Sequence, residues 1–208
     1  MNNLQLRIIS SIFLIPIIIY LIYLNNIYFK IFLFVIFVAS IYELKFAKNH
    51  YLFYFCLLLM ILFIFLLYNL RGNSLEDFYN LLWFITIVWL SDIGGYVFGK
   101  LIKGPKLSKL SPNKTISGFF GSLIFAQFSF MILFVHNLKF IYSEKHFVIQ
   151  FILSLISIFG DLFFSYIKRK FKIKDFSNII PGHGGVLDRI DGLIFVIIFG
   201  YIFKFNYA

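Results

Sequence analysis

Charged side chains are scarce in this 208-residue sequence: only 13% of the residues are Asp, Glu, Lys or Arg, whereas 61% are hydrophobic. No polar stretch is long enough to form a soluble domain, and the mean hydropathy of +0.91 is outside the range of ordinary soluble domains. The bilayer then takes the place of a large water-excluded core. The composition therefore predicts a single integral membrane domain covering residues 1–208.

Cysteine is almost absent, since Cys56 is the only one. A single cysteine excludes an intramolecular disulfide and a zinc site built from several cysteines.

A cleaved signal peptide is also disfavoured. The apolar stretch 8–24 after Arg7 is longer than a typical signal core and has no small-x-small cleavage site. We therefore expect a retained first helix.

Acidic residues are also few, nine against nineteen Lys and Arg, which gives a formal net charge of +10. Such a balance can indicate nucleic-acid binding, but these cations alternate with hydrophobic spans and form no aromatic-basic surface module. We expect no nucleic-acid partner. Anionic lipid headgroups and a phosphorylated substrate fit the charge better.

Apolar stretches dominate what the sequence does contain. About 20 such residues cross a bilayer, and windows of about that length lie at 8–24, 27–44, 51–70, 78–99, 115–135, 147–167 and 190–207. The pattern predicts an all-α, polytopic membrane helix bundle of about seven transmembrane helices. Under this assignment fourteen of the nineteen Lys and Arg fall on one side, which the positive-inside rule makes cytoplasmic. The basic loops 100–114 and 168–189 then open on that side and can build one site.

Four aspartates stand out because charge in a membrane helix is costly. We expect Asp92 and Asp161 to end their apolar helices at the cytoplasmic interface, and Asp188 and Asp191 to meet them there. Clustered carboxylate oxygens suit magnesium, which keeps water and phosphate oxygens as further ligands. The alternative is that these acids pair with neighbouring Lys or Arg and only fix loop geometry; Asp191 could serve to orient Arg189.

Cations and glycines gather between the last two spans. Five cations lie within 168–174, namely Lys168, Arg169, Lys170, Lys172 and Lys174. By themselves they could only fix topology or hold anionic lipid. The following turn contains Gly184 and Gly185, whose backbone N–H groups could approach a phosphate closely. His183 could donate to a phosphate oxygen or move a proton, or it could merely hydrogen-bond within the loop.

A second basic segment runs from Lys100 to Gly118. Its two prolines exclude a continuous helix. Lys114 would lie at the start of the next helix, where the positive end of the helix dipole favours an anion. This segment could complete a binding site for a triphosphate.

Together these residues resemble the phosphatidate cytidylyltransferase family, also called CDP-diacylglycerol synthases. The family pattern of Ser, Lys-Arg, Lys-Asp, His-Gly-Gly and Asp-Arg-x-Asp is filled without a gap; the matching residues are Ser165, Lys168, Arg169, Lys174, Asp175, Ser177, Pro181, His183, Gly184, Gly185, Asp188, Arg189 and Asp191. Gly160-Asp161-Leu162, the segment Asp92 to Gly118 and the pair Tyr42-Glu43 also look like family motifs. The resemblance covers about the last 120 residues well, with the active-site motifs in 91–191, and the first 90 in outline. Phe164 and Ser117 depart from the pattern, because relatives usually have an acid at the first position and often Glu or Gln at the second.

The resemblance implies transfer of CMP from CTP to phosphatidate, which gives CDP-diacylglycerol and pyrophosphate. Asp161 and Asp188 would hold magnesium, with a second, monovalent or divalent cation left open. The implied catalytic residues are Asp161, Asp188, Lys168, Arg169 and His183. The implied substrate-binding residues are Asp92, Lys114, Ser165, Lys174, Gly184, Gly185, Arg189 and Asp191. The expected location is a membrane with the active site on its cytoplasmic side, the plasma (inner) membrane in a bacterium, and a homodimer is an open expectation.

Two alternatives are left open by the residues. A CTP-dependent lipid-alcohol kinase would share the setting and the nucleotide but would transfer the γ-phosphoryl group. A transporter or ion channel would use acids near the middle of the membrane, whereas we expect them at span ends. A purely structural anchor leaves the clustered Gly, His and Asp residues unexplained.

Overall fold

The computed structural model describes residues 3–45, 50–108, 110–136, 143–180 and 184–204, and within these ranges the surroundings of side chains from 12 to 202. Its helices are α1 (Asn3–Leu24), α2 (Ile27–Leu44), α3 (His50–Arg71), α4 (Leu75–Leu101), α5 (Ile116–Ala126), the 3₁₀ turn η1 (Gln127–Phe130), α6 (Met131–His136), α7 (Glu144–Lys170) and α8 (Leu187–Lys204). Across these described ranges there is no β-strand, only two isolated bridges. The predicted all-α membrane bundle is confirmed.

Five segments are long and apolar enough to cross a bilayer: Ile27–Leu44, His50–Arg71, Leu75–Leu101, Ile116–Val135 and Glu144–Lys170. The fourth of these, Ile116–Val135, covers α5, η1 and most of α6, which follow one another without a gap. In α1 the apolar part is the shorter Ile12–Leu24, and α8 carries three charged residues in its first turns. The chain is thus an integral membrane protein, but the predicted count of about seven spans is not confirmed.

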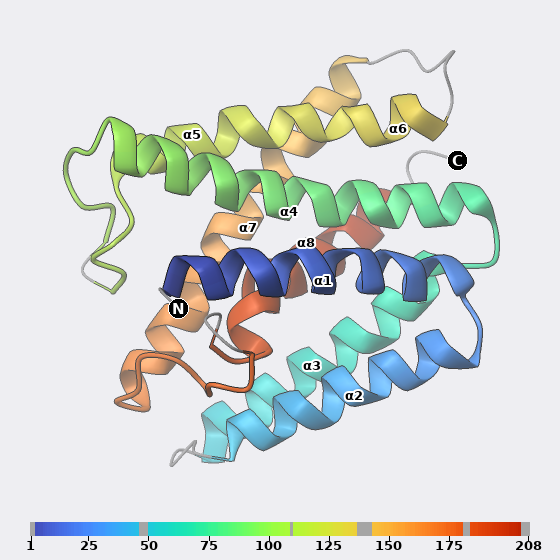
Figure 1. The fold of residues 1–208 in the computed structure, drawn as a ribbon, viewed down its shortest axis with the longest axis horizontal. Coiled ribbons are helices and arrows are strands. Elements are labelled where there is room, and N and C mark those ends of the chain that lie inside the picture. Colours follow the sequence, from blue (N-terminus) through green and yellow to red (C-terminus); the bar gives the residue numbers. More distant parts are fainter. Residues whose placement is uncertain (1–2, 46–49, 109, 137–142, 181–183, 205–208) are drawn as a thin grey trace.

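Consecutive helices run in opposite directions, apart from α5 and α6, which lie end to end, so that the helix ends gather at two ends of the bundle (Figure 1). The amino-terminal ends of α1, α3, α5 and α8 and the carboxy-terminal ends of α2, α4 and α7 lie toward the left and lower left of Figure 1. Both basic connections, 102–115 and 171–186, leave helices at that end. The two segments predicted to form one site therefore share one end of the molecule, called here the basic end.

Three lysines lie over tyrosine rings at this same end. Lys45 lies 3.6 Å from the ring centre of Tyr42, Lys100 lies 5.6 Å from that of Tyr96, and Lys170 lies 5.5 Å from that of Tyr166. All six side chains are exposed and belong to the last turns of α2, α4 and α7 or directly follow them. Tyrosine and lysine together are typical of the boundary between lipid and water, so these pairs mark an interface at the basic end.

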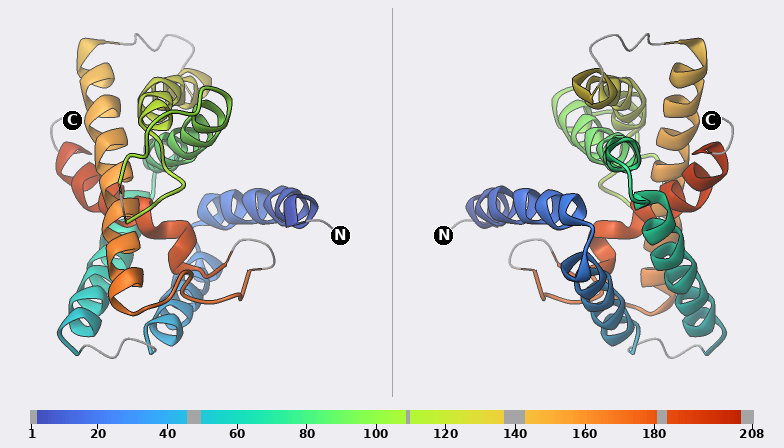
Figure 2. Two further views of the ribbon diagram at one scale, coloured as in Figure 1. Left: turned by 90° about the vertical axis from the view of Figure 1, so that its left-hand side faces the viewer. Right: turned by 90° about the vertical axis from the view of Figure 1, so that its right-hand side faces the viewer.

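Helices α4 and α5 lie closest together, which small residues make possible. A Cβ on Gly95 would lie 2.6 Å from Ser122 Oγ, and one on Gly118 would lie 2.7 Å from the carbonyl oxygen of Gly95. Packing through small residues is a usual way for membrane helices to associate, because lipid leaves no hydrophobic driving force between them. Figure 2 shows α4 and α5 side by side, with α1 projecting away from the other helices.

Arg71 holds the opposite end of the bundle together. It is 3% exposed, and its guanidinium donates hydrogen bonds to the carbonyl oxygens of Ile22 (2.6 Å), Tyr23 (3.0 Å) and Ser74 (3.1 Å). The last carbonyls of a helix have no partner within the helix. Arg71 satisfies two of them for α1 and ties α1 to the connection between α3 and α4.

Candidate active site

Asp161 of α7 is paired with a lysine from the connection between α4 and α5. Lys114 Nζ lies 2.6 Å from Asp161 Oδ2, and the two side chains are 31% and 16% exposed. The backbone places this lysine firmly, because Lys114 N–H donates to Ser111 O and its carbonyl accepts from Leu107 N–H. Thr115 follows as the N-cap of α5 and accepts from Gly118 N–H. The second basic segment thus reaches Asp161, as the predicted shared site requires.

Asp188, in the first turn of α8, has both carboxylate oxygens engaged. Lys168 Nζ of α7 lies 2.7 Å from Oδ1. The backbone N–H groups of Phe176 and Gly185 each donate to Oδ2 at 3.0 Å. The Asp188 side chain is only 4% exposed, and a buried carboxylate is stable there because each oxygen has donors.

Lys168 connects Asp188 to the other acids. Its ammonium lies 3.9 Å from Asp191 Oδ2 as well as 2.7 Å from Asp188 Oδ1. Asp191 in turn interacts electrostatically with Asp161 and with Asp92. Asp161 and Asp188 are therefore linked through Asp191 and Lys168: Lys168 bridges the carboxylates of Asp188 and Asp191, and Asp191 faces the like charge of Asp161.

Asp92 adds a third helix to this cluster. Its side chain is exposed and interacts electrostatically with Asp161, and with the opposite charges of Lys114 and Arg189. Four carboxylates from α4, α7 and α8 thus face three cations in one region, called here the acid-base cluster: Asp92, Asp161, Asp188, Asp191, Lys114, Lys168 and Arg189. The predicted convergence of the four acids is observed, and so is the alternative that Lys residues pair with them.

The crossing of α7 and α8 depends on two glycines beside the acids. A Cβ on Gly160 would lie 2.9 Å from the carbonyl oxygen of Asp191, and one on Gly192 would lie 2.8 Å from both Asp161 Oδ1 and Ser157 Oγ. Any side chain at either position would force the helices apart or displace the carboxylate. Close approach here sets the spacing between Asp161 and the start of α8.

The expectation that Asp92 and Asp161 end their helices is wrong. Helix α4 continues nine residues beyond Asp92, to Leu101, and α7 continues nine residues beyond Asp161, to Lys170. At 1.5 Å per residue, each acid lies roughly 13 Å inside its helix end. The small residues beside each acid, Gly94 and Gly95 after Asp92 and Gly160 before Asp161, do not break the helix, because small residues are tolerated where membrane helices pack closely. Asp92 and Asp161 thus do not lie at the ends of their spans, and their position cannot be used to exclude a transporter.

The glycine turn is arranged differently from the phosphate loop that we predicted. Gly184, at φ +85°, donates its N–H to the carbonyl oxygen of Ile180. Gly185 donates its N–H to Asp188 Oδ2. In this structure both N–H groups serve the fold of the loop, so that binding of an anion by them would first require these bonds to open.

The remaining predicted residues lie around the cluster. Arg169 and Lys174 are exposed, and Arg169 donates to the carbonyl oxygen of Ile173 at 3.0 Å. Ser165 is half-buried on α7, one turn before Arg169. His183 lies outside the described residues, as do Pro181 and Gly182. The roles proposed for these residues stay predictions.

Glu43 and Phe164 contribute to the site in ways that we did not predict. Glu43, 1% exposed at the end of α2, accepts hydrogen bonds from the start of α8; its only signal in the sequence was the match of Tyr42-Glu43 to a family motif. Phe164 stands where relatives usually have an acid, and here it is fully buried. Its ring centre lies 6.2 Å from that of Phe176 and 6.3 Å from that of Phe195, so this chain replaces the expected charge with aromatic packing.

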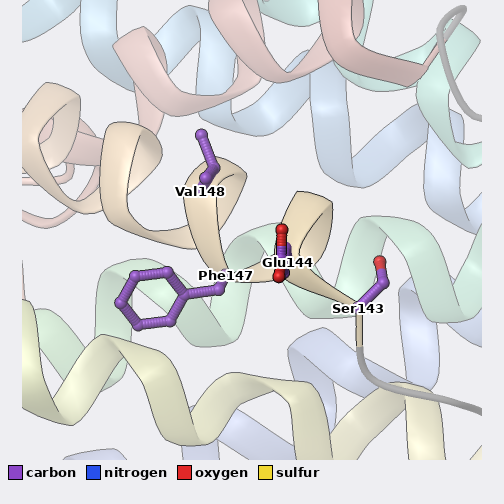
Figure 3. Close-up of a pocket in the computed structure, with 4 residues that line it drawn as sticks. All are labelled: Ser143, Glu144, Phe147 and Val148. Atoms are coloured by element: carbon purple, nitrogen blue, oxygen red, sulfur yellow. The ribbon is translucent and has the colours of Figure 1, made fainter.

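A surface pocket lies at the far end of α7 from the acid-base cluster. Its lining consists of Ser143, Glu144, Phe147 and Val148, from the cap and first turns of that helix (Figure 3). Glu144 begins the helix, whereas Asp161 and Lys168 belong to its second half. The pocket is therefore separate from the predicted active site.

The carboxylates of the acid-base cluster are ligands of the kind that magnesium prefers, and Asp161 is better placed to bind it than Asp188. Carboxylate oxygens are the protein ligands that magnesium prefers. Within the described part of the chain, no hydrogen bond to Asp161 Oδ1 is recorded, whereas both oxygens of Asp188 are engaged. Those same residues also contain no group of three His, Cys, Asp or Glu arranged to hold a metal ion. A metal at Asp188 would require Lys168 to move.

Charged side chains from three helices that meet within a polytopic membrane bundle mark a functional site. Residues 45–206 match the profile of the Cytidylyltransferase family, and the chain belongs to that family. The match includes every residue of the acid-base cluster, and it confirms the resemblance stated above. The protein is accordingly a nucleotidyltransferase.

Relatives with the printed name phosphatidate cytidylyltransferase are similar over much of the chain. One from Rickettsia bellii is 36% identical over 203 residues, which are 93% of this chain and 87% of that protein. One from Rickettsia conorii is 41% identical over 140 residues, 63% of this chain and 61% of that protein. One from Staphylococcus saprophyticus is 39% identical over 132 residues, 63% of this chain and 50% of that protein. The similar region thus spans most of the first relative but only about half to three fifths of the other two.

Proposed function

We propose that this protein transfers CMP from CTP to phosphatidate and releases pyrophosphate, forming CDP-diacylglycerol. The observation that carries the proposal is the acid-base cluster, which gathers charges from α4, α7 and α8 and the α4–α5 connection inside a membrane bundle, in the halves of α4 and α7 nearer the basic end. The names of the similar bacterial proteins support the choice of substrates.

The reaction needs alignment more than it needs a protein nucleophile. A phosphate oxygen of phosphatidate attacks the α-phosphorus of CTP, a new P–O bond forms, and the bond from the α-phosphorus to the bridging oxygen breaks. Negative charge then builds up on the departing pyrophosphate. Enzymes promote such transfers mainly by positioning and by charge stabilisation.

The three cations of the cluster, together with Arg169 on α7, are suited to that task. Arg189 is exposed beside Asp92, and Arg169 is exposed near the end of α7; a guanidinium can bind two phosphate oxygens at once. Lys114 and Lys168 are each held by a carboxylate, which fixes their positions before substrate binds. We propose that these four side chains bind the phosphates of both substrates.

Magnesium is the metal ion that we propose for this site. Asp161 and Asp188 would hold it, Asp161 through an oxygen free of recorded hydrogen bonds and Asp188 after release of Lys168. When bound, magnesium neutralises charge on a triphosphate. Whether a second cation takes part stays a prediction.

The proposed location is the plasma (inner) membrane with the acid-base cluster on the cytoplasmic side. The positive-inside rule supports this orientation, since both basic connections lie at the basic end. The named relatives are bacterial. Cytoplasmic CTP would then reach the site directly. A homodimer stays a prediction.

Labelled CTP tests the proposal directly. Purified protein in detergent with phosphatidate and magnesium should move label from the α-phosphate of CTP into lipid, and Asp188→Asn should lose at least 99% of that rate, since a buried, fully hydrogen-bonded carboxylate is replaced. Transfer of γ-label into lipid would instead identify a lipid kinase. Failure to transfer either label would contradict both.

A further inference from the structure

Glu43 is a buried acid whose hydrogen bonds all go to the segment that carries the family motif. Ser177 Oγ donates to Oε1 at 2.6 Å, Val186 N–H donates to Oε1 at 2.7 Å, and Leu187 N–H donates to Oε2 at 2.8 Å. The partners lie 134 to 144 residues away in sequence. Glu43 thus joins the end of α2 to the start of α8.

The position of these donors explains why a buried charge is tolerated. The first N–H groups of a helix have no partner within the helix and carry its positive dipole end. Among the recorded ion pairs of the described residues, none involves Glu43. The Glu43 carboxylate is therefore stabilised by the N–H groups of α8, and it caps that helix in place of a local residue.

Glu43 and Asp188 hold the glycine turn from two sides. A Cβ on Gly185 would lie 2.6 to 2.8 Å from the carboxylate atoms of Glu43, while Gly185 N–H donates to Asp188 Oδ2. A Cβ on Gly184 would lie 3.1 Å from Asp188 Oδ2. A glycine at 185 is required because the Glu43 carboxylate takes the place that a side chain would fill.

We propose that Glu43 is a positioning residue for the active site: by fixing Val186 and Leu187, it sets the direction in which α8 presents Asp188. Glu43 lies before the part of the chain that matches the family profile, which begins at residue 45, and it does not belong to the acid-base cluster. The kinetic test of this inference rests on the proposed function, because it measures CDP-diacylglycerol formation. The structural test, by hydrogen exchange, is independent of that function.

Glu43→Gln keeps the volume of the side chain but replaces one oxygen with an amide NH₂. At least one of the N–H donors of Val186 and Leu187 then faces another donor. We expect kcat for CDP-diacylglycerol formation to fall at least tenfold, because a displaced carboxylate impairs alignment. The KM for CTP should stay within about twofold, as expected for a loss that falls on the chemical step.

Ser40→Ala is the matched control. Ser40 lies one turn earlier on α2, is fully buried like Glu43, and its hydroxyl has no hydrogen-bond partner among the residues that the structure describes. Its replacement should leave kcat and thermal stability unchanged. Hydrogen exchange adds a readout independent of activity: Glu43→Gln should speed exchange of the Val186 and Leu187 amides about tenfold or more, whereas Ser40→Ala should not.

The outcomes separate this inference from the proposed function. If the wild-type protein forms no CDP-diacylglycerol, the proposed function fails, and the exchange of the two amides still decides whether Glu43 holds α8. If the wild-type protein is active and Glu43→Gln matches it in kcat and exchange, the inference is overturned. It is also overturned if Glu43→Gln loses protection throughout α2, α3 and α8, since Glu43 would then serve general stability only.

Discussion

Lys114 and Asp161 are hydrogen bonded across 2.6 Å although they are 47 residues apart in sequence. The pair links the α4–α5 connection to α7, and the side chain of Asp161 is only 16% exposed. A carboxylate in such a position needs a cation nearby. The pair therefore fixes both the lysine and the acid that we propose to act on CTP.

Replacing Lys114 with methionine should lower kcat/KM for CTP by about 10²-fold, in the range seen when one preorganised electrostatic group is removed from an active site. Methionine retains most of the side-chain volume but none of the charge. Lys106→Met in the same connection is the control, because Lys106 is exposed; it should cost less than about threefold. Equal losses in the two variants would show that net positive charge, and not the contact with Asp161, matters.

Gly192→Ala should disturb the site more than the fold. The added Cβ would lie 2.8 Å from Asp161 Oδ1 and from Ser157 Oγ, so the Asp161 side chain would have to turn or α7 and α8 would have to separate. Overpacking of this kind costs about 1–3 kcal/mol, and kcat should fall at least tenfold. Rates and thermal unfolding in detergent would be compared with Gly200→Ala, where the added Cβ would meet only the ring of Phe84 at 3.2 to 3.3 Å. Wild-type kcat in Gly192→Ala would contradict the assigned spacing.

Most of the fold could be predicted because a bilayer imposes helices. The window 27–44 coincides with α2, and 51–70 differs from α3 by one residue at each end. The ends of α4 and α7 were less accurate, since Asp92 and Asp161, with the small residues beside them, suggested termini where the helices continue. Hydropathy indicates which segments contact lipid. It does not indicate where a helix ends, because that depends on the capping residues and on packing against neighbouring helices.

The sequence indicated which residues form the candidate site, but not which of them contact one another. Asp92, Asp161, Asp188 and Asp191 were recognisable as costly charges, and they converge. No local spacing indicates which lysine pairs with which acid. Glu43 shows the limit best, because its bond to Val186 joins residues 143 apart, and only the assembled bundle brings them together.

Arg71→Lys should reduce stability without a specific loss of activity. Lysine cannot reproduce the separate bonds to the carbonyls of Ile22, Tyr23 and Ser74, because its donors share a single nitrogen. Leaving buried carbonyls unsatisfied should cost about 2 kcal/mol or more. Thermal unfolding should shift downward, while kcat below the transition stays within about twofold, because Arg71 lies at the opposite end of the bundle. A tenfold fall in kcat would show coupling between the two ends.

Phe164→Glu restores the kind of residue that relatives usually have beside the motif serine, and it should nevertheless harm this protein. Phe164 is fully buried, and it packs against the ring of Phe176, whose N–H donates to Asp188 Oδ2. Lys168 Nζ lies 5.6 Å from the ring centre of Phe176 but is already paired with Asp188, so a carboxylate buried among these aromatic rings should cost several kcal/mol. We expect the variant to unfold at lower temperature and to lose most of its activity, whereas Phe164→Leu, which introduces no charge, should cost less than the roughly 3–5 kcal/mol of a Phe→Ala change and keep most of its rate. If Phe164→Glu were as stable as the wild type and more active, position 164 would face the substrates, and the aromatic packing described here would not be what supports Asp188.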